Sequence, residues 1–282
     1  MKTVLVLGIS GFTGRHFQRF VTEHKLDEKF NFVGVTRDVD LSLENSFELI
    51  VQRHRPSYVV NFIGAIGRKS VGELIKVNAL MSQRLLEACL RFGDAIERIL
   101  LIGSAAEYGK PLALPITEGH ELRPISNYGL SKVLQTDIAN FFWRTHGLPI
   151  VMARPFNLSG PDLSPELSLG TFMDQIRRAA PGDVIKTGDL SARRDFVSIN
   201  DAVRAYWDIL MKGQNGEVYN VCSGYSLQMH EILLDLIRRS EKTLKIQIET
   251  DRFRKDDILD IFGSFAKLQA HVGWEPKASN PY

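Results

Sequence analysis

Near its start the chain reads Val4-Leu5-Val6-Leu7-Gly8-Ile9-Ser10-Gly11-Phe12-Thr13-Gly14 and then continues into a helical pattern. The apolar run predicts a strand, the glycines predict a tight turn, and the apolar residues that follow have helical spacing. Such a unit can bind a dinucleotide, because glycines let the backbone approach the pyrophosphate and the helix N-terminus supplies N–H donors. The alternative is that the glycines form only a turn. We expect cofactor contacts at Gly8, Gly11, Phe12, Thr13 and Gly14.

The first half of the chain alternates short apolar runs with longer amphipathic segments. Strands are predicted at residues 3–8, 32–36, 58–63, 98–102 and 150–153, and helices at residues 14–23, 47–53, 72–92 and 127–146. This alternation is typical of a parallel sheet covered by helices. The predicted fold class is α/β, with a Rossmann-type doubly wound parallel sheet and a smaller α/β substrate-binding lobe.

The second half is less regular, and it predicts the smaller lobe. Helices are expected at residues 171–180, 200–212, 227–240 and 264–271, and strands at 184–187, 196–198, 218–222 and 245–249. The strand at 218–222 is expected to rejoin the sheet. We therefore divide the chain into a dinucleotide-binding domain, residues 1–160 with 196–224 returning to it, and a substrate lobe, residues 161–195 and 225–282. Ligands are expected between the two.

Composition narrows the class of protein. The chain has 282 residues with a formal net charge of +2, 44% hydrophobic residues and 24% charged residues, which is typical of a globular protein and makes no electrostatic case for nucleic acid or membrane. Cys89 and Cys222 fall in apolar stretches, so we expect buried thiols, and no metal site is expected. No signal peptide or long apolar run is recognised, which favours a cytoplasmic location. The apolar stripe of residues 72–92 is either core or a dimer contact, and a homodimer is expected.

Three residues suggest proton-transfer chemistry. Tyr128 and Lys132 are four residues apart, so on a helix they share a face, and Ser104 follows a predicted strand. A free phenol has a pKa of ~10, and lowering it by about three units requires roughly 4 kcal/mol, which a lysine ammonium and a positively charged nicotinamide can supply. The alternative for Tyr128 is a half-buried aromatic. The small residues Ile63-Gly64-Ala65 end another predicted strand, where the chain can pass close to a ribose or nicotinamide.

The end of the second predicted strand bears on the choice of cofactor. An acidic residue there would bind an adenosine ribose diol, whereas an arginine would bind a 2′-phosphate. The chain reads Thr36-Arg37-Asp38, so Arg37 favours NADP(H), while Asp38 leaves NAD(H) possible. Asp40 and Leu41 follow and are expected near the adenine, although Asp40 can equally cap local structure.

Further motifs extend across nearly the whole chain, and together they resemble those of the extended short-chain dehydrogenases/reductases of the nucleotide-sugar epimerase/dehydratase group. The most similar subgroup by pattern is the reductases of GDP-linked 4-keto-6-deoxyhexoses. The motifs are the glycines of the opening turn, Gly103-Ser104-Ala105-Ala106-Glu107-Tyr108-Gly109, Tyr128-Gly129-Leu130-Ser131-Lys132, Arg154-Pro155-Phe156-Asn157, Gly188-Asp189-Leu190-Ser191-Ala192-Arg193-Arg194-Asp195-Phe196-Val197, Tyr219-Asn220-Val221 and Gly273-Trp274.

The resemblance implies roles for individual residues. Ser104, Tyr128 and Lys132 match the catalytic triad, with Tyr128 and Lys132 also touching the cofactor. The other implied contacts are Pro155 with the cofactor, Ala105 and Asn157 with the substrate, and Arg194 and Arg254 with the phosphates of a nucleoside-diphosphate sugar. Guanidinium groups bind phosphates in a fork geometry. The alternative for Arg194 is an ion pair with Asp195.

Two departures from the group's pattern narrow the chemistry that it implies. Related 4,6-dehydratases carry an acidic residue just after the catalytic serine or threonine. Here Ala105 and Ala106 occupy those positions and Glu107 comes one residue too late, so a dehydratase is disfavoured. The chain also ends at Tyr282, soon after Gly273-Trp274, where family members commonly continue into a terminal helix, so a trimmed substrate lobe is expected.

Three functions follow in order of preference. The first is NADPH-dependent reduction of a 4-keto sugar linked to a nucleoside diphosphate, with GDP favoured, in deoxysugar biosynthesis. The second is a 4-epimerase that retains NAD, and the third is a catalytically silent protein that senses the cofactor. The intact set Ser104, Tyr128 and Lys132 argues against the third.

Overall fold

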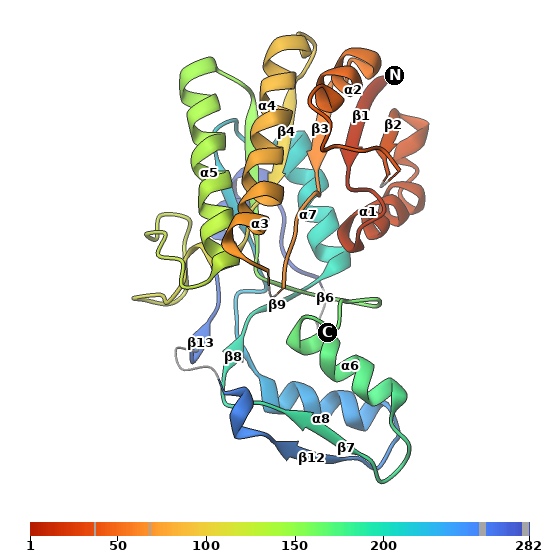
Figure 1. Cartoon of the computed structure of the whole chain (residues 1–282), viewed down its shortest axis with the longest axis vertical. Coiled ribbons are helices and arrows are strands. Elements are labelled where there is room, and N and C mark those ends of the chain that lie inside the picture. Colours follow the sequence, from red (N-terminus) through yellow and green to blue (C-terminus); the bar gives the residue numbers. More distant parts are fainter. Residues whose placement is uncertain (37, 68, 254–257, 278–281) are drawn as a thin grey trace.

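A six-stranded parallel sheet forms the centre of the molecule, with the strand order β10-β5-β4-β3-β1-β2 (Figure 1). The structure is a computed structural model, and it describes all residues except 37, 68, 254–257 and 278–281. From β1 the chain first pairs β2 on one side and then crosses to β3 on the other, which is the reversal of a doubly wound fold. The predicted Rossmann-type sheet is confirmed, as is the return of its last strand. The strands are β1 (Lys2–Leu7), β2 (Phe30–Val35), β3 (Tyr58–Asn61), β4 (Arg98–Ile102), β5 (Ile150–Pro155) and β10 (Val218–Val221).

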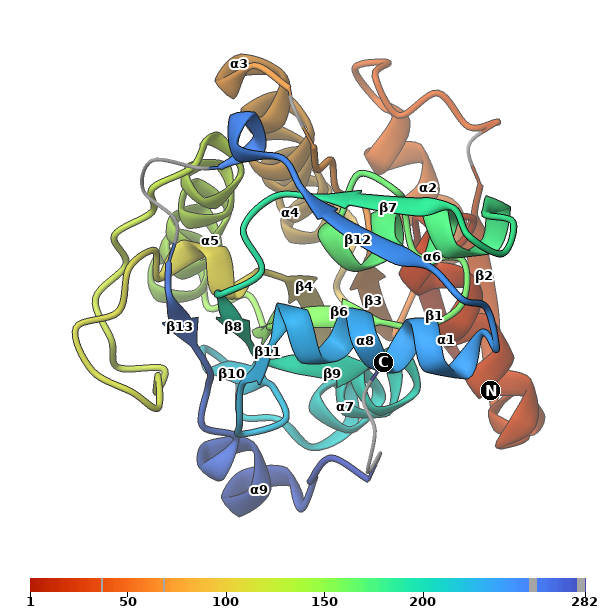
Figure 2. The same ribbon diagram turned by 90° about the horizontal axis from the view of Figure 1, so that it is seen from below.

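Helices cover both faces of the sheet, as Figure 2 shows. They are α1 (Phe12–Glu23), α2 (Ser46–His54), α3 (Val71–Ile75), α4 (Met81–Phe92), α5 (Asn127–His146), α7 (Ile199–Lys212) and α9 (Ala266–Val272). Val4 and Val6 of β1 pack with α1, α7 and α9, whereas Leu5 and Leu7 pack with α2, α4 and α5. Successive strand side chains point to opposite faces, so an apolar run such as Val4–Leu7 needs a helix layer on each side.

One predicted helix, residues 72–92, contains a π-helical turn. This turn, η2 (Lys76–Leu80), lies between α3 and α4 and buries Asn78 and Ala79, whereas Val77 is only partly buried. The Asn78 amide accepts a hydrogen bond from the Ala65 N–H at 2.8 Å and donates one to the Ala65 carbonyl at 3.0 Å. The irregular turn therefore brings a polar side chain to the loop after β3, and such turns often occur at functional sites.

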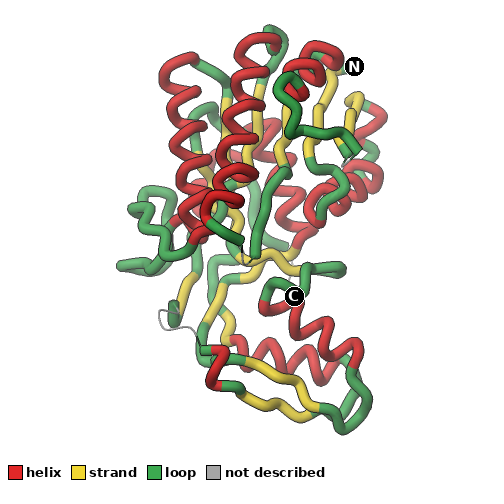
Figure 3. The backbone as a smooth tube through the Cα atoms, in the orientation of Figure 1, coloured by secondary structure: helices red, strands yellow, loops and turns green. Residues whose placement is uncertain are grey.

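A second group of elements lies beyond the carboxyl ends of the sheet strands (Figures 1 and 3). A separate apolar core, which includes Phe172, Ile185, Ile232 and Leu233, holds its two helices, α6 and α8, against β7. Four short strands, β6, β8, β11 and β13, were not predicted. The elements of this group are β6 (Asn157–Ser159), α6 (Ser168–Arg178), β7 (Val184–Thr187), β8 (Arg193–Arg194), β9 (Phe196–Ser198), β11 (Leu227–Gln228), α8 (Met229–Arg239), β12 (Lys245–Ile248) and β13 (Asp260–Ile261).

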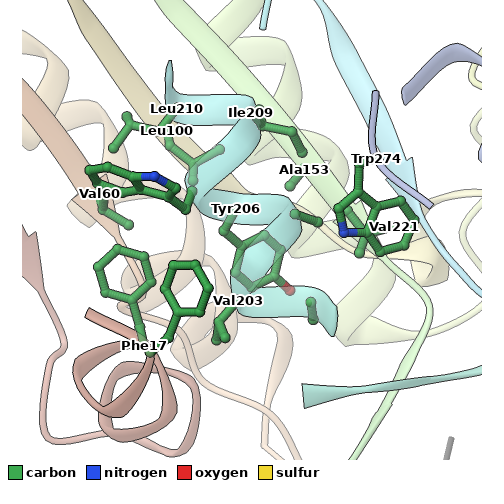
Figure 4. Packing of buried hydrophobic residues seen from close by; sticks show 14 of the residues in the cluster. Phe17, Val60, Leu100, Ala153, Val203, Tyr206, Ile209, Leu210, Val221 and Trp274 are labelled. Atoms are coloured by element: carbon green, nitrogen blue, oxygen red, sulfur yellow. The ribbon is translucent and has the colours of Figure 1, made fainter. Parts of the chain in front are cut away.

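Helix α7 lies in the centre of one helix layer. Figure 4 shows Tyr206 and Ile209 of this helix among the buried residues of the sheet, and both are fully buried. Trp274, also fully buried, donates a hydrogen bond from its indole nitrogen to the Asp201 carbonyl at 3.2 Å, so the chain after α9 is tied to the start of α7.

The two cysteines behave as the sequence predicted. Cys89 and Cys222 are free and buried, and burial raises the pKa of Cys89 to about 12. None of the helices in the described part of the chain combines the length and apolarity that a membrane crossing requires.

Candidate active site

The glycine turn connects β1 to α1 against the end of β3. Gly8 has a φ of 76°, a left-handed conformation that favours glycine. A Cβ on Gly8 would lie 3.0 Å from the Ile63 nitrogen, and a Cβ on Gly14 would lie 2.4 Å from the Gly8 carbonyl oxygen. Only glycines therefore let the helix begin this close to the turn and the turn lie this close to β3.

The same turn has hydrogen-bond donors that fit the phosphates of a dinucleotide. Helix α1 begins at Phe12 after Gly11, and no side chain caps its first N–H groups. The Ser10 Oγ is buried and has no hydrogen-bond partner among the described residues. A helix N-terminus with uncapped N–H groups attracts an anion. The predicted contacts Gly8 to Gly14 thus lie in the turn and the first turn of α1, and their role as cofactor ligands stays a prediction.

The loop after β2 makes its own hydrogen bonds. The Thr36 hydroxyl donates to the Asp38 carboxylate, and this bond lowers the Asp38 pKa. The Asp40 carboxylate accepts from the Ser42 hydroxyl at 2.6 Å and the Ser42 N–H at 2.9 Å, which lowers its pKa. Asp40 therefore caps a local turn, as the alternative proposed, and its contact with adenine stays a prediction. Arg37, the residue that favoured NADP(H), lies outside the described residues.

Ser104 and Tyr128 lie side by side, although they come from different elements. Ser104 follows β4 and begins the short 3₁₀ helix η3 (Ala105–Glu107), and its Oγ accepts the Ala106 N–H at 3.2 Å. Burial raises the pKa of Tyr128 to about 12, and a hydrogen bond with Ser104 opposes this rise. The protein's own groups therefore do not produce the lowered phenol pKa that the sequence suggested. The phenol is protonated at neutral pH and is able to donate a proton.

Lys132 lies one helical turn after Tyr128 in α5. The side chain is 4% exposed, and its Nζ donates to the Ile102 carbonyl at 2.8 Å and to Gln135 Oε1 at 2.9 Å. Burial lowers the Lys132 pKa to about 8. A Cβ on Gly64 would lie 3.8 Å from this Nζ, so the ammonium faces the small residues that follow β3. The predicted cofactor residue Gly64 and the predicted catalytic Lys132 therefore lie close together.

Two of the expected substrate residues, Asn157 and Arg194, lie in the second group of elements. Asn157 donates from its side chain to the Asp195 carbonyl at 2.8 Å. Arg194 donates to the Ile258 carbonyl at 2.5 Å, and the Asp195 carboxylate accepts from Ser223 and neighbouring backbone N–H groups. Arg254 lies outside the described residues. The binding roles of Asn157, Arg194 and Arg254 stay predictions.

Three residues predicted to contact the substrate or the cofactor are apolar. Ala105 is 7% exposed, Pro155 is buried at the end of β5, and Leu41 is partly buried against the core of one helix layer. A site at the carboxyl ends of the strands needs such surfaces, because apolar walls exclude water from the reacting groups.

Sequence reasoning missed several polar residues near these groups. Gln135 lies three residues after Lys132 and shares its helix face, a spacing that could have identified it. Asn78 stood out only as a polar residue in an apolar stripe. Arg84 of α4 donates to the carbonyls of Leu41 and Glu44, each at 2.9 Å, and so holds the loop after β2 in place.

Comparisons with known proteins identify the family. The model of the NAD dependent epimerase/dehydratase family matches residues 4–222. The chain belongs to this family. The chain is 28% identical to a GDP-6-deoxy-D-mannose reductase from Pseudomonas aeruginosa. The alignment covers 98% of this chain and 92% of the reductase.

Solved structures agree with this membership. The structure of RMD from Pseudomonas aeruginosa complexed with NADPH has a TM-score of 0.87 and 27% identity, and it covers 99% of this chain and 95% of that chain. A Thermus thermophilus UDP-glucose 4-epimerase in complex with NAD has a TM-score of 0.84 and 26% identity. This match covers 98% of this chain and 94% of the epimerase chain. The relatives described above are a GDP-sugar reductase, a protein complexed with NADPH and a UDP-glucose 4-epimerase in complex with NAD, and a dTDP-glucose 4,6-dehydratase from Actinoplanes matches at 28% identity as well.

Proposed function

We propose that the protein reduces the 4-keto group of a nucleoside-diphosphate 4-keto-6-deoxyhexose with NADPH. The observation that carries this proposal is the Ser104 hydroxyl beside a protonated Tyr128 phenol, close enough to oppose the rise in the pKa of Tyr128, with Lys132 one helical turn away. Similarity to a GDP-6-deoxy-D-mannose reductase and to a structure complexed with NADPH supports reduction and favours a GDP sugar.

The three residues divide the chemistry. NADPH, when bound, would supply the hydride that reduces the C4 carbonyl carbon. Tyr128 donates its phenolic proton to the carbonyl oxygen, and the product is an alcohol. Ser104 hydrogen-bonds the same oxygen and polarises the carbonyl. Lys132 would bind the nicotinamide ribose, and its positive charge stabilises the phenolate that remains after proton transfer.

Dehydration of the sugar would need an acidic side chain after Ser104 to protonate the leaving hydroxyl group, and the residues there do not provide one. Ala105 and Ala106 cannot transfer protons, and Glu107 is fully buried and hydrogen-bonded to Ser104, Thr136 and Arg154. A carboxylate held in this way has no free position from which to protonate a leaving hydroxyl group.

Other features of the proposal come from the sequence. Arg37 would bind the 2′-phosphate of NADPH, and Arg194 and Arg254 would bind the two phosphates of the sugar nucleotide. The dinucleotide-binding domain of residues 1–160 and 196–224 and the substrate lobe of residues 161–195 and 225–282 would enclose the ligands between them. A homodimer in the cytoplasm stays our prediction.

A substrate panel tests the function. GDP-, dTDP-, CDP- and UDP-linked 4-keto-6-deoxyhexoses are supplied with NADPH or NADH, and the loss of absorbance of the reduced nicotinamide is followed. We expect turnover with NADPH and a GDP sugar, and a 10²–10⁴-fold fall in kcat for Tyr128→Phe with NADPH binding retained. Absence of turnover with every member of the panel, or full activity of Tyr128→Phe, would refute the proposal.

A 4-epimerase is the second candidate, because a UDP-glucose 4-epimerase in complex with NAD shares the fold at 26% identity. An epimerase reduces its own intermediate and keeps its cofactor, whereas a reductase must release the oxidised form in each cycle. Denaturing the purified protein and measuring the released NAD(H) and NADP(H) distinguishes the two. About one equivalent of NAD(H) per chain, together with epimerisation of a UDP-hexose, would favour the epimerase.

A further inference from the structure

A buried carboxylate, that of Glu107, joins the elements that carry the proposed site. Glu107 Oε1 accepts the Ser104 N–H at 2.7 Å. Its Oε2 accepts the Thr136 hydroxyl at 2.7 Å and the Arg154 Nε at 2.8 Å. Thr136 belongs to α5 and Arg154 to β5, so one side chain links the serine turn to both the helix of Tyr128 and the sheet.

The carboxylate is held by a fully hydrogen-bonded network. Arg154 is 3% exposed, stacks on the Tyr108 ring at 5.0 Å and donates to the Tyr108 hydroxyl at 3.1 Å. That hydroxyl donates to Asn220 Oδ1 of β10 at 2.7 Å. A buried ion pair adds little net stability, because desolvation offsets the attraction. What the network does supply is a single orientation for Glu107.

The contacts relate Ser104 directly to the proposed proton donor. Thr136 lies four residues after Lys132 and eight after Tyr128, so the three side chains lie along one side of α5. The turn lies directly against this carboxylate, since a Cβ on Gly103 would lie 2.5 Å from Glu107 Oε1. The bonds of Glu107 to the Ser104 N–H and to the Thr136 hydroxyl therefore fix how the Ser104 turn lies against the helix that carries Tyr128.

We propose that Glu107 is a positioning residue of this site: its carboxylate clamps the Ser104 turn to α5 through Thr136 and holds the Ser104 hydroxyl at the Tyr128 phenol. The inference rests on the proposed function, in which Ser104 and Tyr128 act on the carbonyl oxygen. The charge of Glu107 also raises the pKa of Tyr128 and of Lys132, which keeps both groups in the protonated form that reduction requires. The charged and titratable groups facing Glu107 are Arg154 from β5, Tyr128 and Lys132 from α5, and Tyr108 beside it.

The first test removes only the link to α5. Thr136→Val replaces the hydroxyl by a methyl group of similar size, and we expect kcat to fall about 10-fold while KM and the NADPH Kd change less than about two-fold, because the reacting groups and not the binding sites are misplaced. Thr136→Ser keeps the donor and should retain most of the activity. Thr187→Val is the matched control, because Thr187 is also buried but its hydroxyl has no partner among the described residues.

The second test removes the charge together with its partner. In Glu107→Gln/Arg154→Met no unpaired charge stays buried, and we expect the alkaline limb of the kcat–pH profile to move to lower pH, since the group that keeps Tyr128 and Lys132 protonated is gone. Wild-type kcat and an unmoved profile in Thr136→Val and in the double variant would overturn the proposal. A fall in NADPH affinity with unchanged kcat in Thr136→Val would overturn it too.

Hydrogen exchange separates this inference from the proposed function. The Ser104 amide is bonded to Glu107, so exchange in the peptide that contains it should be faster in Thr136→Val than in wild type or Thr136→Ser, whatever the substrate. Faster exchange in a protein that turns over none of the 4-keto sugars would refute the proposed reductase function and support the positioning role of Glu107. Unchanged exchange would refute the clamp even in an active reductase.

Discussion

Replacement of Lys132 by methionine should stabilise the unliganded protein in a way that depends on pH. Burial lowers the Lys132 pKa from its ordinary 10.5 to about 8. Below pH 8 the lysine is protonated in both the folded and the unfolded chain, so the folded state carries the full desolvation cost of the ammonium. At about 1.4 kcal/mol per pH unit this cost is about 3 kcal/mol. As the pH rises through 8, the folded protein releases the proton while the unfolded chain still holds it, so the wild-type protein gains stability up to about pH 10.5.

Urea unfolding of wild type and Lys132→Met at about pH 7 and about pH 9.5 measures this effect. The wild-type free energy of unfolding should improve relative to the variant by about 2 kcal/mol between the two conditions. The hydrogen bonds to Ile102 and Gln135 are lost in the variant at both pH values, so they largely cancel in the comparison. Lys212→Met removes an exposed ammonium at the end of α7 and serves as the control. A stability difference between wild type and Lys132→Met that does not change with pH would refute the reasoning.

Two further substitutions test packing near the site. Gly14→Ala places a methyl group 2.4 Å from the Gly8 carbonyl oxygen, so we expect a loss of about 1–3 kcal/mol in unfolding free energy and at least about 10-fold weaker NADPH binding, measured by urea unfolding and fluorescence titration. Gly72→Ala, also in the first turn of a helix but with open space around it, should be neutral or stabilising, and equal effects at the two positions would contradict the steric argument. Tyr206→Phe removes a buried hydroxyl that has no partner among the described residues, so thermal unfolding should show a gain of about 1 kcal/mol. Tyr219→Phe should instead lose stability because its hydroxyl accepts the Gln214 N–H at 2.9 Å, and a shift of the same sign in both variants would count against this account.

Much of the fold was predictable from local patterns. The helix at residues 127–146 and the strands at 184–187 and 196–198 were predicted with the bounds that the structure has, because caps and changes of period mark their ends. Tyr128 and Lys132 were predicted to share a helix face, and they lie one turn apart in α5, whereas the catalytic roles of Ser104, Tyr128 and Lys132 stay predictions. The π turn at Lys76–Leu80 could not be predicted, since the contacts of Asn78 with Ala65 and Ser131 favour it, and these residues are distant in sequence.

The role of Glu107 shows the limit of sequence reasoning most clearly. From its position after Ala105 and Ala106 we could say only that it does not suit a dehydratase. Its partners, Thr136 and Arg154, lie 29 and 47 residues further along the chain, and neither spacing marks a contact.

The order of apolar runs, amphipathic segments and glycines was sufficient to predict the parallel sheet and the turn at Gly8, because strand alternation, helical periodicity and backbone sterics act over a few neighbouring residues. The pKa values of the proposed reacting groups, in contrast, are set by the tertiary structure. Tyr128 holds its proton more tightly and Lys132 less tightly than in water because distant segments of the chain pack around them and exclude the solvent that would stabilise their charged forms.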